Sequence, residues 1–111
     1  MAAEKNFENR VKRYLQTVGV YALGTSKHKM IVTPVGYYEK RHGSMFTKRG
    51  LPDMHICIHG RSIEVELKGE NGEPEELQLF MLQQINESGG KGILLYPKDF
   101  EAFKELIGEY L

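Results

Sequence analysis

A period-two pattern over residues 53–68 constrains the fold of this chain more than any other feature. Apolar residues occupy every second position on both sides of His59-Gly60: Met54, Ile56, Ile58, Ile63, Val65 and Leu67. Alternation at this period predicts two half-buried strands, and a short glycine-containing turn between them is typical of a hairpin. The sequence therefore predicts a β-hairpin with a two-residue turn.

A two-residue turn fixes which residues face each other across the hairpin. Ile58 then pairs with Arg61, and Asp53 lies opposite Glu66, with Cβ atoms roughly 4.5–5.5 Å apart. Lys68 projects from the same face as Glu66, because side chains two apart on a strand point the same way. Two carboxylates this close repel unless one is protonated or a cation lies between them. An oxygen-seeking ion such as Mg²⁺ or Mn²⁺ meets that need, and with a lysine nearby it suits hydrolysis of a phosphodiester.

An acid two residues before a lysine is common in sequences. Taken alone, Glu64, Glu66 and Lys68 indicate no more than a solvated strand face with cross-strand ion pairs. The opposed Asp53 weakens that interpretation, because directly opposed like charges destabilise a hairpin that has no use for them.

Helical and strand patterns flank the hairpin. Helices are predicted over 4–18, 74–88 and 97–110, and further strands over 20–23, 30–38 and 91–96. Pro34 and Gly36 interrupt the second of these strands. The expected fold is α/β, in the order α-β-β-β-α-β-α, with a mixed sheet flanked by helices. The whole chain, 1–111, is expected to be one domain.

Two polar residues on the predicted helices are candidates to join the hairpin acids. Gln78 shares a helical stripe with the apolar residues of its helix and therefore points inward. The alternative is a hydrogen-bonded glutamine at the rim of the core. Glu4 lies in line with the apolar stripe of the first helix, although the helix dipole alone favours an acid at that end.

Composition and charge narrow the setting. No apolar run among the 111 residues approaches a membrane span or a secretory signal. A single cysteine, Cys57, cannot form an internal disulfide, which favours an intracellular, cytoplasmic location. Net charge is zero, but residues 1–62 carry 11 basic and 4 acidic residues, and residues 63–111 carry 4 and 11. Both a basic face for a phosphate backbone and neutralisation within the fold fit this asymmetry.

Four motifs stand in order along the chain: Gly50-Leu51-Pro52-Asp53, Glu66-Leu67-Lys68, Gly72 and Gln78. In this order and spacing they resemble the signature of the PD-(D/E)xK nucleases, and most closely that of the VRR-NUC branch. That branch has a Gly-x-Pro-Asp motif, a Glu-x-Lys strand, a glycine four residues after the lysine and a glutamine ten after it. The resemblance covers nearly the whole chain and implies a restriction-endonuclease-like core that forms a single VRR-NUC-like nuclease domain.

The resemblance also implies roles for individual residues. It implies that Mg²⁺ or Mn²⁺ is bound by the side chains of Asp53 and Glu66 and by the backbone carbonyl of Leu67. The catalytic residues that it implies are Lys68, Gln78 and Glu4. Glu8, one turn beyond Glu4, is the alternative helix acid.

Single-domain members of this family are associated with cutting branched DNA, including four-way (Holliday) junctions, as homodimers. A four-way junction has approximate two-fold symmetry, which a two-fold dimer with one site per chain would match. The basic segment 27–49 supplies the candidate phosphate contacts, which are Lys27, Lys29, Lys40, Arg41, Lys48 and Arg49. Residues 30–35 and the last helix are candidate dimer surfaces.

Three other functions fit parts of the sequence. A non-catalytic nuclease-fold module that binds nucleic acid would not need the full set of active-site residues. A zinc protein would use His55, Cys57 and His59, but three ligands in a row on one strand face cannot easily surround a tetrahedral ion. A restriction-type nuclease reading duplex DNA would share the fold and the chemistry, although 111 residues leave little material for reading bases.

Overall fold

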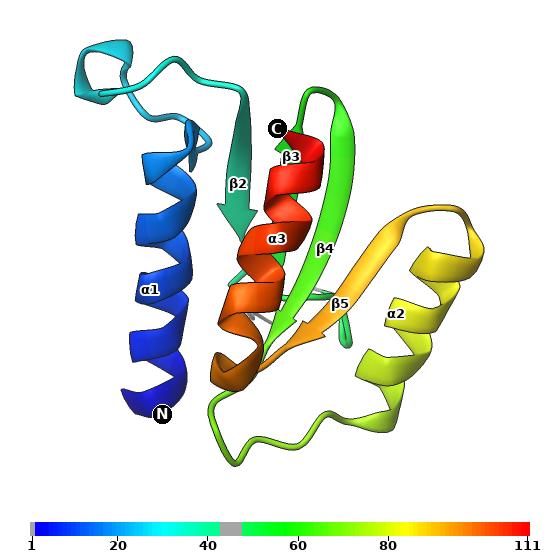
Figure 1. The fold of residues 1–111 in the computed structure, drawn as a ribbon. Helices are drawn as coiled ribbons and strands as arrows, with labels where there is room; N and C mark the ends of the chain where they lie inside the picture. Colours follow the sequence, from blue (N-terminus) through cyan, green and yellow to red (C-terminus); the bar gives the residue numbers. More distant parts are fainter. Residues whose placement is uncertain (1, 43–47) are drawn as a thin grey trace.

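The computed structural model describes residues 2–42 and 48–111. Its helices and strands are α1 (Ala2–Thr17), β1 (Val20–Ala22), β2 (Gly36–Lys40), β3 (Met54–Ile58), β4 (Arg61–Leu67), α2 (Glu76–Glu87), β5 (Lys91–Leu95) and α3 (Phe100–Tyr110). Two short 3₁₀ helices, η1 (Lys27–Lys29) and η2 (Pro97–Asp99), precede β2 and α3. The predicted α/β class, a mixed sheet flanked by helices, is confirmed (Figure 1). None of the helices described is long and apolar enough to cross a bilayer.

The five strands follow one another across the sheet in the order β1-β2-β3-β4-β5. The outer pairs, β1–β2 and β4–β5, are parallel, whereas β2–β3 and β3–β4 are antiparallel. Four strands precede α2, one more than in the expected order α-β-β-β-α-β-α. The predicted ranges, 20–23, 30–38 and the two strands of the hairpin, also give four strands before this helix, so the expected order counted one strand too few.

The strand predicted over residues 30–38 is wrong in its first part. β2 begins only at Gly36, and residues 30–35 lead into it without strand structure. Pro34 has no backbone N–H to give to a ladder. The N–H groups of Ile31 and Val32 donate instead to the hydroxyl of Tyr21, over 2.9 and 3.0 Å.

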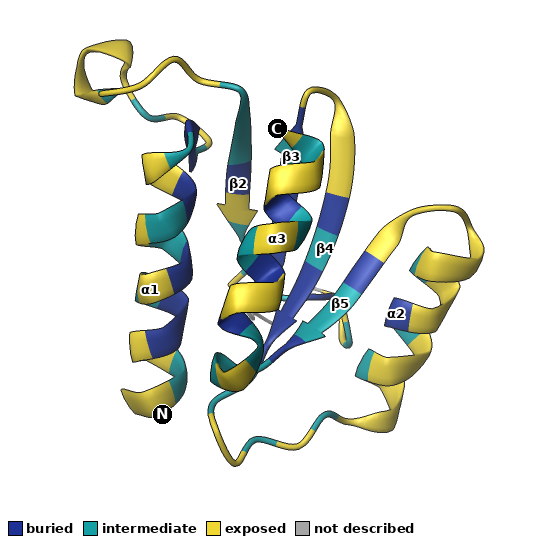
Figure 2. Ribbon diagram, viewed as in Figure 1, coloured by how far each residue is buried: buried dark blue, intermediate teal, exposed yellow. Residues whose placement is uncertain are grey.

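Helices α1 and α3 pack on one face of the sheet, and this side holds the core (Figure 2). The alternating residues of the hairpin point into it, and Met54, Ile56, Ile58, Ile63 and Val65 are fully buried. Helix α2 lies on the other face beside β5, since a Cβ atom added to Gly92 would be 3.2 Å from the Leu82 side chain. Leu82 is the one buried residue of α2. The second face, which carries the polar side chains of the hairpin, is therefore thinly covered.

Candidate active site

The hairpin turn sets the register that brings the two acids together. His59 and Gly60 both have positive φ, 49° and 79°, as a two-residue type I′ turn requires. Ile58 pairs with Arg61, as expected, and the ladder continues to Met54 and Val65. Asp53 and Glu66 are the next pair beyond the ladder. Their side chains lie on the face opposite the core, where α2 packs.

Asp53 is held from both sides. Its Oδ2 atom accepts a hydrogen bond from the backbone N–H of Leu67, over 2.9 Å. Its carbonyl oxygen accepts one from the backbone N–H of Arg41, over 2.7 Å. The Leu67 side chain is buried in the core. Leu67, whose backbone carbonyl is the candidate third ligand, is therefore held against the Asp53 carboxylate through its own N–H.

Glu66 is an acid that folding has removed from water, with 2% of its surface exposed. Its Oε2 atom accepts a hydrogen bond from Gln78 Nε2 at 2.9 Å and lies 3.5 Å from Lys68 Nζ. Within the described residues, its buried Oε1 atom has no hydrogen-bond partner. Burial raises the pKa of Glu66 to about 7; the charge of Asp53 and a hydrogen bond with it add to the rise, while Lys68 opposes it. A carboxylate oxygen this buried and unpaired is a natural ligand for a cation.

Lys68 follows β4 and points to the same side of the sheet as Glu66. Its backbone N–H donates to the carbonyl of Leu95, which fixes the chain at the end of β4. The loop after it folds back, so that a Cβ atom at Gly72 would lie 3.3 Å from both Cβ and Cδ of Lys68. Tyr96 holds this loop by donating its hydroxyl to the Gly72 carbonyl, over 2.8 Å. The glycine four residues after the lysine therefore leaves room for the stem of the lysine.

Gln78 reaches the site from the first turn of α2. Its Oε1 atom accepts the backbone N–H of Glu75, over 2.8 Å, in a reciprocal capping box that starts the helix. This bond fixes the orientation of the amide, so that Nε2 faces Glu66. The helix consequently begins at Glu76, two residues after the predicted start. Gln78 therefore takes part in the capping box of α2 and also binds the buried acid Glu66.

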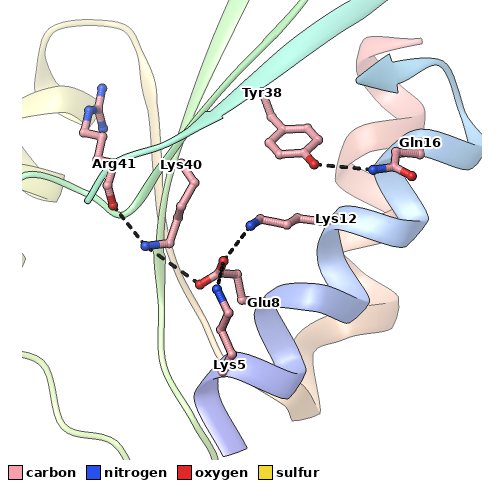
Figure 3. A network of polar contacts seen from close by, with 7 residues as sticks. All are labelled: Lys5, Glu8, Lys12, Gln16, Tyr38, Lys40 and Arg41. Atoms are coloured by element: carbon pink, nitrogen blue, oxygen red, sulfur yellow. Dashed lines mark hydrogen bonds and ion pairs between the residues drawn. The ribbon is translucent and has the colours of Figure 1, made fainter. Parts of the chain in front are cut away.

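The two candidate helix acids occupy different environments. Glu8 is buried, at 6% exposure, and meets the ammonium groups of Lys5, Lys12 and Lys40 over 3.1, 2.7 and 3.8 Å (Figure 3). Burial alone would raise the pKa of Glu8, but hydrogen bonds from Lys12 and Lys5 and the charge of Lys40 together hold it below its usual value. Glu4 is half-buried and lines a shallow pocket with residues 69–72, just beyond Lys68.

The sheet separates Glu8 from the hairpin acids. Lys40, its partner, pairs with Met54 and so shares the core face, whereas Asp53 and Glu66 lie on the other face. Glu4 lies where the loop after Lys68 rounds the end of the sheet. Of the two, Glu4 is the acid beside Gly69, the residue after Lys68, whereas Glu8 is paired with three lysines.

The six candidate phosphate contacts do not form one surface. Lys27 and Lys29 are exposed on η1, before the start of β2, whereas Lys40 and Arg41 lie at and just beyond its other end (Figure 1). Lys48 and Arg49 are exposed beside Gly50. Residues 43–47 of the predicted basic segment lie outside the described residues. Lys40 and Arg41 point their charged groups at protein atoms, as the contacts of Glu8 and Glu64 show.

One polar cluster at the site was missed in the sequence. The Glu64 carboxylate receives Nη1 of Arg41 at 2.6 Å through one oxygen and the ring Nδ1 of His55 through the other. His55 and Glu64 are directly opposed in the hairpin. The register that pairs Asp53 with Glu66 also predicts this pair, and that signal was available. The position of Arg41 could not be predicted, because it depends on a contact with Glu64, which lies 23 residues away along the chain.

The other predicted features have simpler outcomes. His55, Cys57 and His59 do not gather into a ligand set, and no group of three or more His, Cys, Asp or Glu side chains suited to a metal exists within the described ranges. Of the two candidate dimer surfaces, the last helix, α3, buries its apolar stripe in the chain's own core. In the other candidate surface, residues 30–35, Ile31 is 95% exposed.

Comparison with known proteins adds no relative. Neither a protein-family model, nor a curated protein, nor a solved structure matches this chain. The likeness to VRR-NUC nucleases therefore depends on the motif residues themselves.

Proposed function

We propose that this protein is an Mg²⁺- or Mn²⁺-dependent DNA endonuclease, selective for branched DNA such as four-way junctions and active as a homodimer. The observation that carries the proposal is the buried Glu66 carboxylate, whose Oε1 atom has no protein partner among the described residues and whose neighbour is a second acid, Asp53. When both carboxylates are ionised they repel, and a cation bound between them would relieve that repulsion.

The donor set fits a hard divalent cation. Asp53, Glu66 and the Leu67 carbonyl offer oxygen atoms only, which Mg²⁺ and Mn²⁺ prefer. Three protein ligands leave further positions for water and a phosphate oxygen, as is usual for Mg²⁺. Bound there, the cation would neutralise charge on the phosphate and make a bound water more acidic.

The remaining residues supply binding, orientation and charge. Lys68 places its ammonium beside Glu66 Oε2, where it can stabilise negative charge that builds up on the phosphate oxygens and orient the attacking water. Gln78 holds Glu66 Oε2 through its amide and so keeps Oε1 free for the cation. Hydrolysis adds the water across one P–O bond, leaving one free hydroxyl end and one phosphate monoester end.

The preference for branched DNA is supported by the resemblance and by symmetry. One site per chain requires two chains for paired cuts, and a two-fold dimer matches a four-way junction. The exposed cations at Lys48 and Arg49, close to the Pro52-Asp53 motif, supply phosphate contacts at the site.

The test is cleavage of a labelled four-way junction beside a linear duplex of the same sequence, with Mg²⁺ or Mn²⁺ and with EDTA. Lys68→Ala is compared with Lys91→Ala, which removes the same charge from an exposed position at the other end of the sheet. Paired cuts near the branch, lost with EDTA and in Lys68→Ala but kept in Lys91→Ala, are expected. Equal cutting of both DNAs would contradict the preference for branched DNA and indicate a nuclease that acts on duplex DNA. Binding without cutting would indicate a non-catalytic module.

A further inference from the structure

Arg41 joins three parts of the candidate site. Its backbone N–H donates to the carbonyl of Asp53, over 2.7 Å. Its Nη1 atom donates to the carbonyl of Pro52 at 2.8 Å and to Glu64 Oε1 at 2.6 Å. Because Nη1 carries two N–H groups, these two acceptors occupy both of them. The same residue thus holds both peptides of the Pro-Asp motif and an acid of β4.

The partners of Arg41 are themselves fixed. Lys40 donates its Nζ to the carbonyl of Arg41 over 3.0 Å and faces Glu8 on the core side (Figure 3). His55 takes the second oxygen of Glu64. The Arg41 and Glu64 side chains are only 27% and 14% exposed. A charge-assisted pair with this shielding is better oriented than an ion pair on the open surface.

Asp53 needs such support because it lies one residue beyond both ladders that contain β3. The β2–β3 register ends at Lys40 and Met54, and the β3–β4 register ends at Met54 and Val65. The Asp53 carboxylate is anchored to β4 by the N–H of Leu67. Its main chain is anchored to the end of β2 by Arg41. The position of the carboxylate is therefore set jointly by the two neighbouring strands.

We propose that Arg41 is a positioning residue for Asp53, and through it for the divalent cation, rather than a contact to the DNA backbone. This inference rests on the proposed function, since it takes Asp53 to be a ligand. Groups that orient a metal ligand typically change metal affinity by about 10–100-fold when they are removed. A loss of that size is expected for Arg41→Ala.

The test measures binding of Mn²⁺ to the whole protein without DNA, by isothermal titration calorimetry. Arg41→Ala is compared with Arg49→Ala, which removes the same charge from an exposed position four residues before Asp53. Arg41→Ala is expected to bind Mn²⁺ about 10–100-fold more weakly and to keep its DNA affinity in EDTA. Arg49→Ala is expected to show the opposite pattern. Far-UV circular dichroism establishes that each variant is folded.

Each outcome decides a different question. Wild-type Mn²⁺ affinity in Arg41→Ala would overturn the positioning role and leave the nuclease proposal standing. Wild-type protein that binds no Mn²⁺ would overturn the proposed function and, with it, this role. Where Arg41→Ala does not fold, Arg41→Gln is measured in its place. It keeps a polar side chain but removes the guanidinium whose Nη1 atom donates to Pro52 and Glu64, so wild-type Mn²⁺ affinity in this variant also overturns the proposal.

Discussion

Replacing Glu66 by glutamine should stabilise the metal-free protein at neutral and alkaline pH. In the folded chain the pKa of Glu66 is raised to about 7 from 4.5. Between these two values the unfolded chain has lost the proton that the folded chain keeps. The free energy of unfolding therefore falls as the pH rises from about 4.5 to about 7. Glutamine has the same shape, carries no charge and can still accept the hydrogen bond from Gln78.

The size of the effect follows from the shift. One pKa unit corresponds to about 1.4 kcal/mol, so the rise in the pKa of Glu66 amounts to about 3 kcal/mol at pH 8. Solvent screens little of this free energy, because the Glu66 side chain is buried. For a domain of this size that free energy corresponds to about 13 °C in melting temperature. Near pH 4, where the glutamate is protonated, the variant and the wild type should differ little.

Thermal and urea unfolding at pH 4, 6 and 8, in EDTA, measures this difference. Glu73→Gln, at an exposed position in the loop before α2, is the matched control and should leave the pH dependence unchanged. Adding Mn²⁺ should stabilise the wild type and not Glu66→Gln. A Glu66→Gln protein that is less stable than the wild type at pH 8 in EDTA would show that the charged carboxylate is satisfied within the fold. The argument for a cation would then fail.

Three further perturbations test the capping box of α2, the packing of the core and the proposed DNA-binding surface. Gln78→Ala removes a helix cap and the hydrogen bond to Glu66, so unfolding should become easier by about 1–2 kcal/mol and kcat should fall; unchanged melting would contradict the capping box. Ile63→Ala leaves a cavity in the core and should cost about 2–5 kcal/mol in urea unfolding, and a smaller cost would mean that the core repacks. DNA affinity should fall steeply with salt, and Lys48→Ala combined with Arg49→Ala should reduce the slope by about two; an unchanged slope would move the DNA to another surface.

The hairpin could be predicted from the sequence because every signal in it is local. Alternation assigns the faces, and a two-residue turn at His59 and Gly60 sets the register, so the meeting of Asp53 with Glu66 follows without other information. The His55–Glu64 pair follows from the same register. A one-residue slip would have moved all these side chains to the wrong face.

The helix acids and the cations could not be assigned in this way. Periodicity places Glu4 and Glu8 on similar stripes, but which of them is buried depends on where Lys12 and Lys40 lie in the fold. As a basic residue Arg41 was a candidate DNA contact, but its guanidinium donates a hydrogen bond to the Pro52 carbonyl within the fold. Such contacts join segments that are distant in the sequence, and composition carries no information about them.

We propose that Asp53 and Glu66 hold a divalent cation used for cleavage. A crystal of the protein grown with Mn²⁺, with anomalous diffraction recorded near the manganese edge, tests it most directly. A single strong anomalous peak is expected within about 2.0–2.3 Å of Glu66 Oε1 and an Asp53 carboxylate oxygen. Manganese bound elsewhere, with none between these two carboxylates in protein that cleaves DNA, would contradict it.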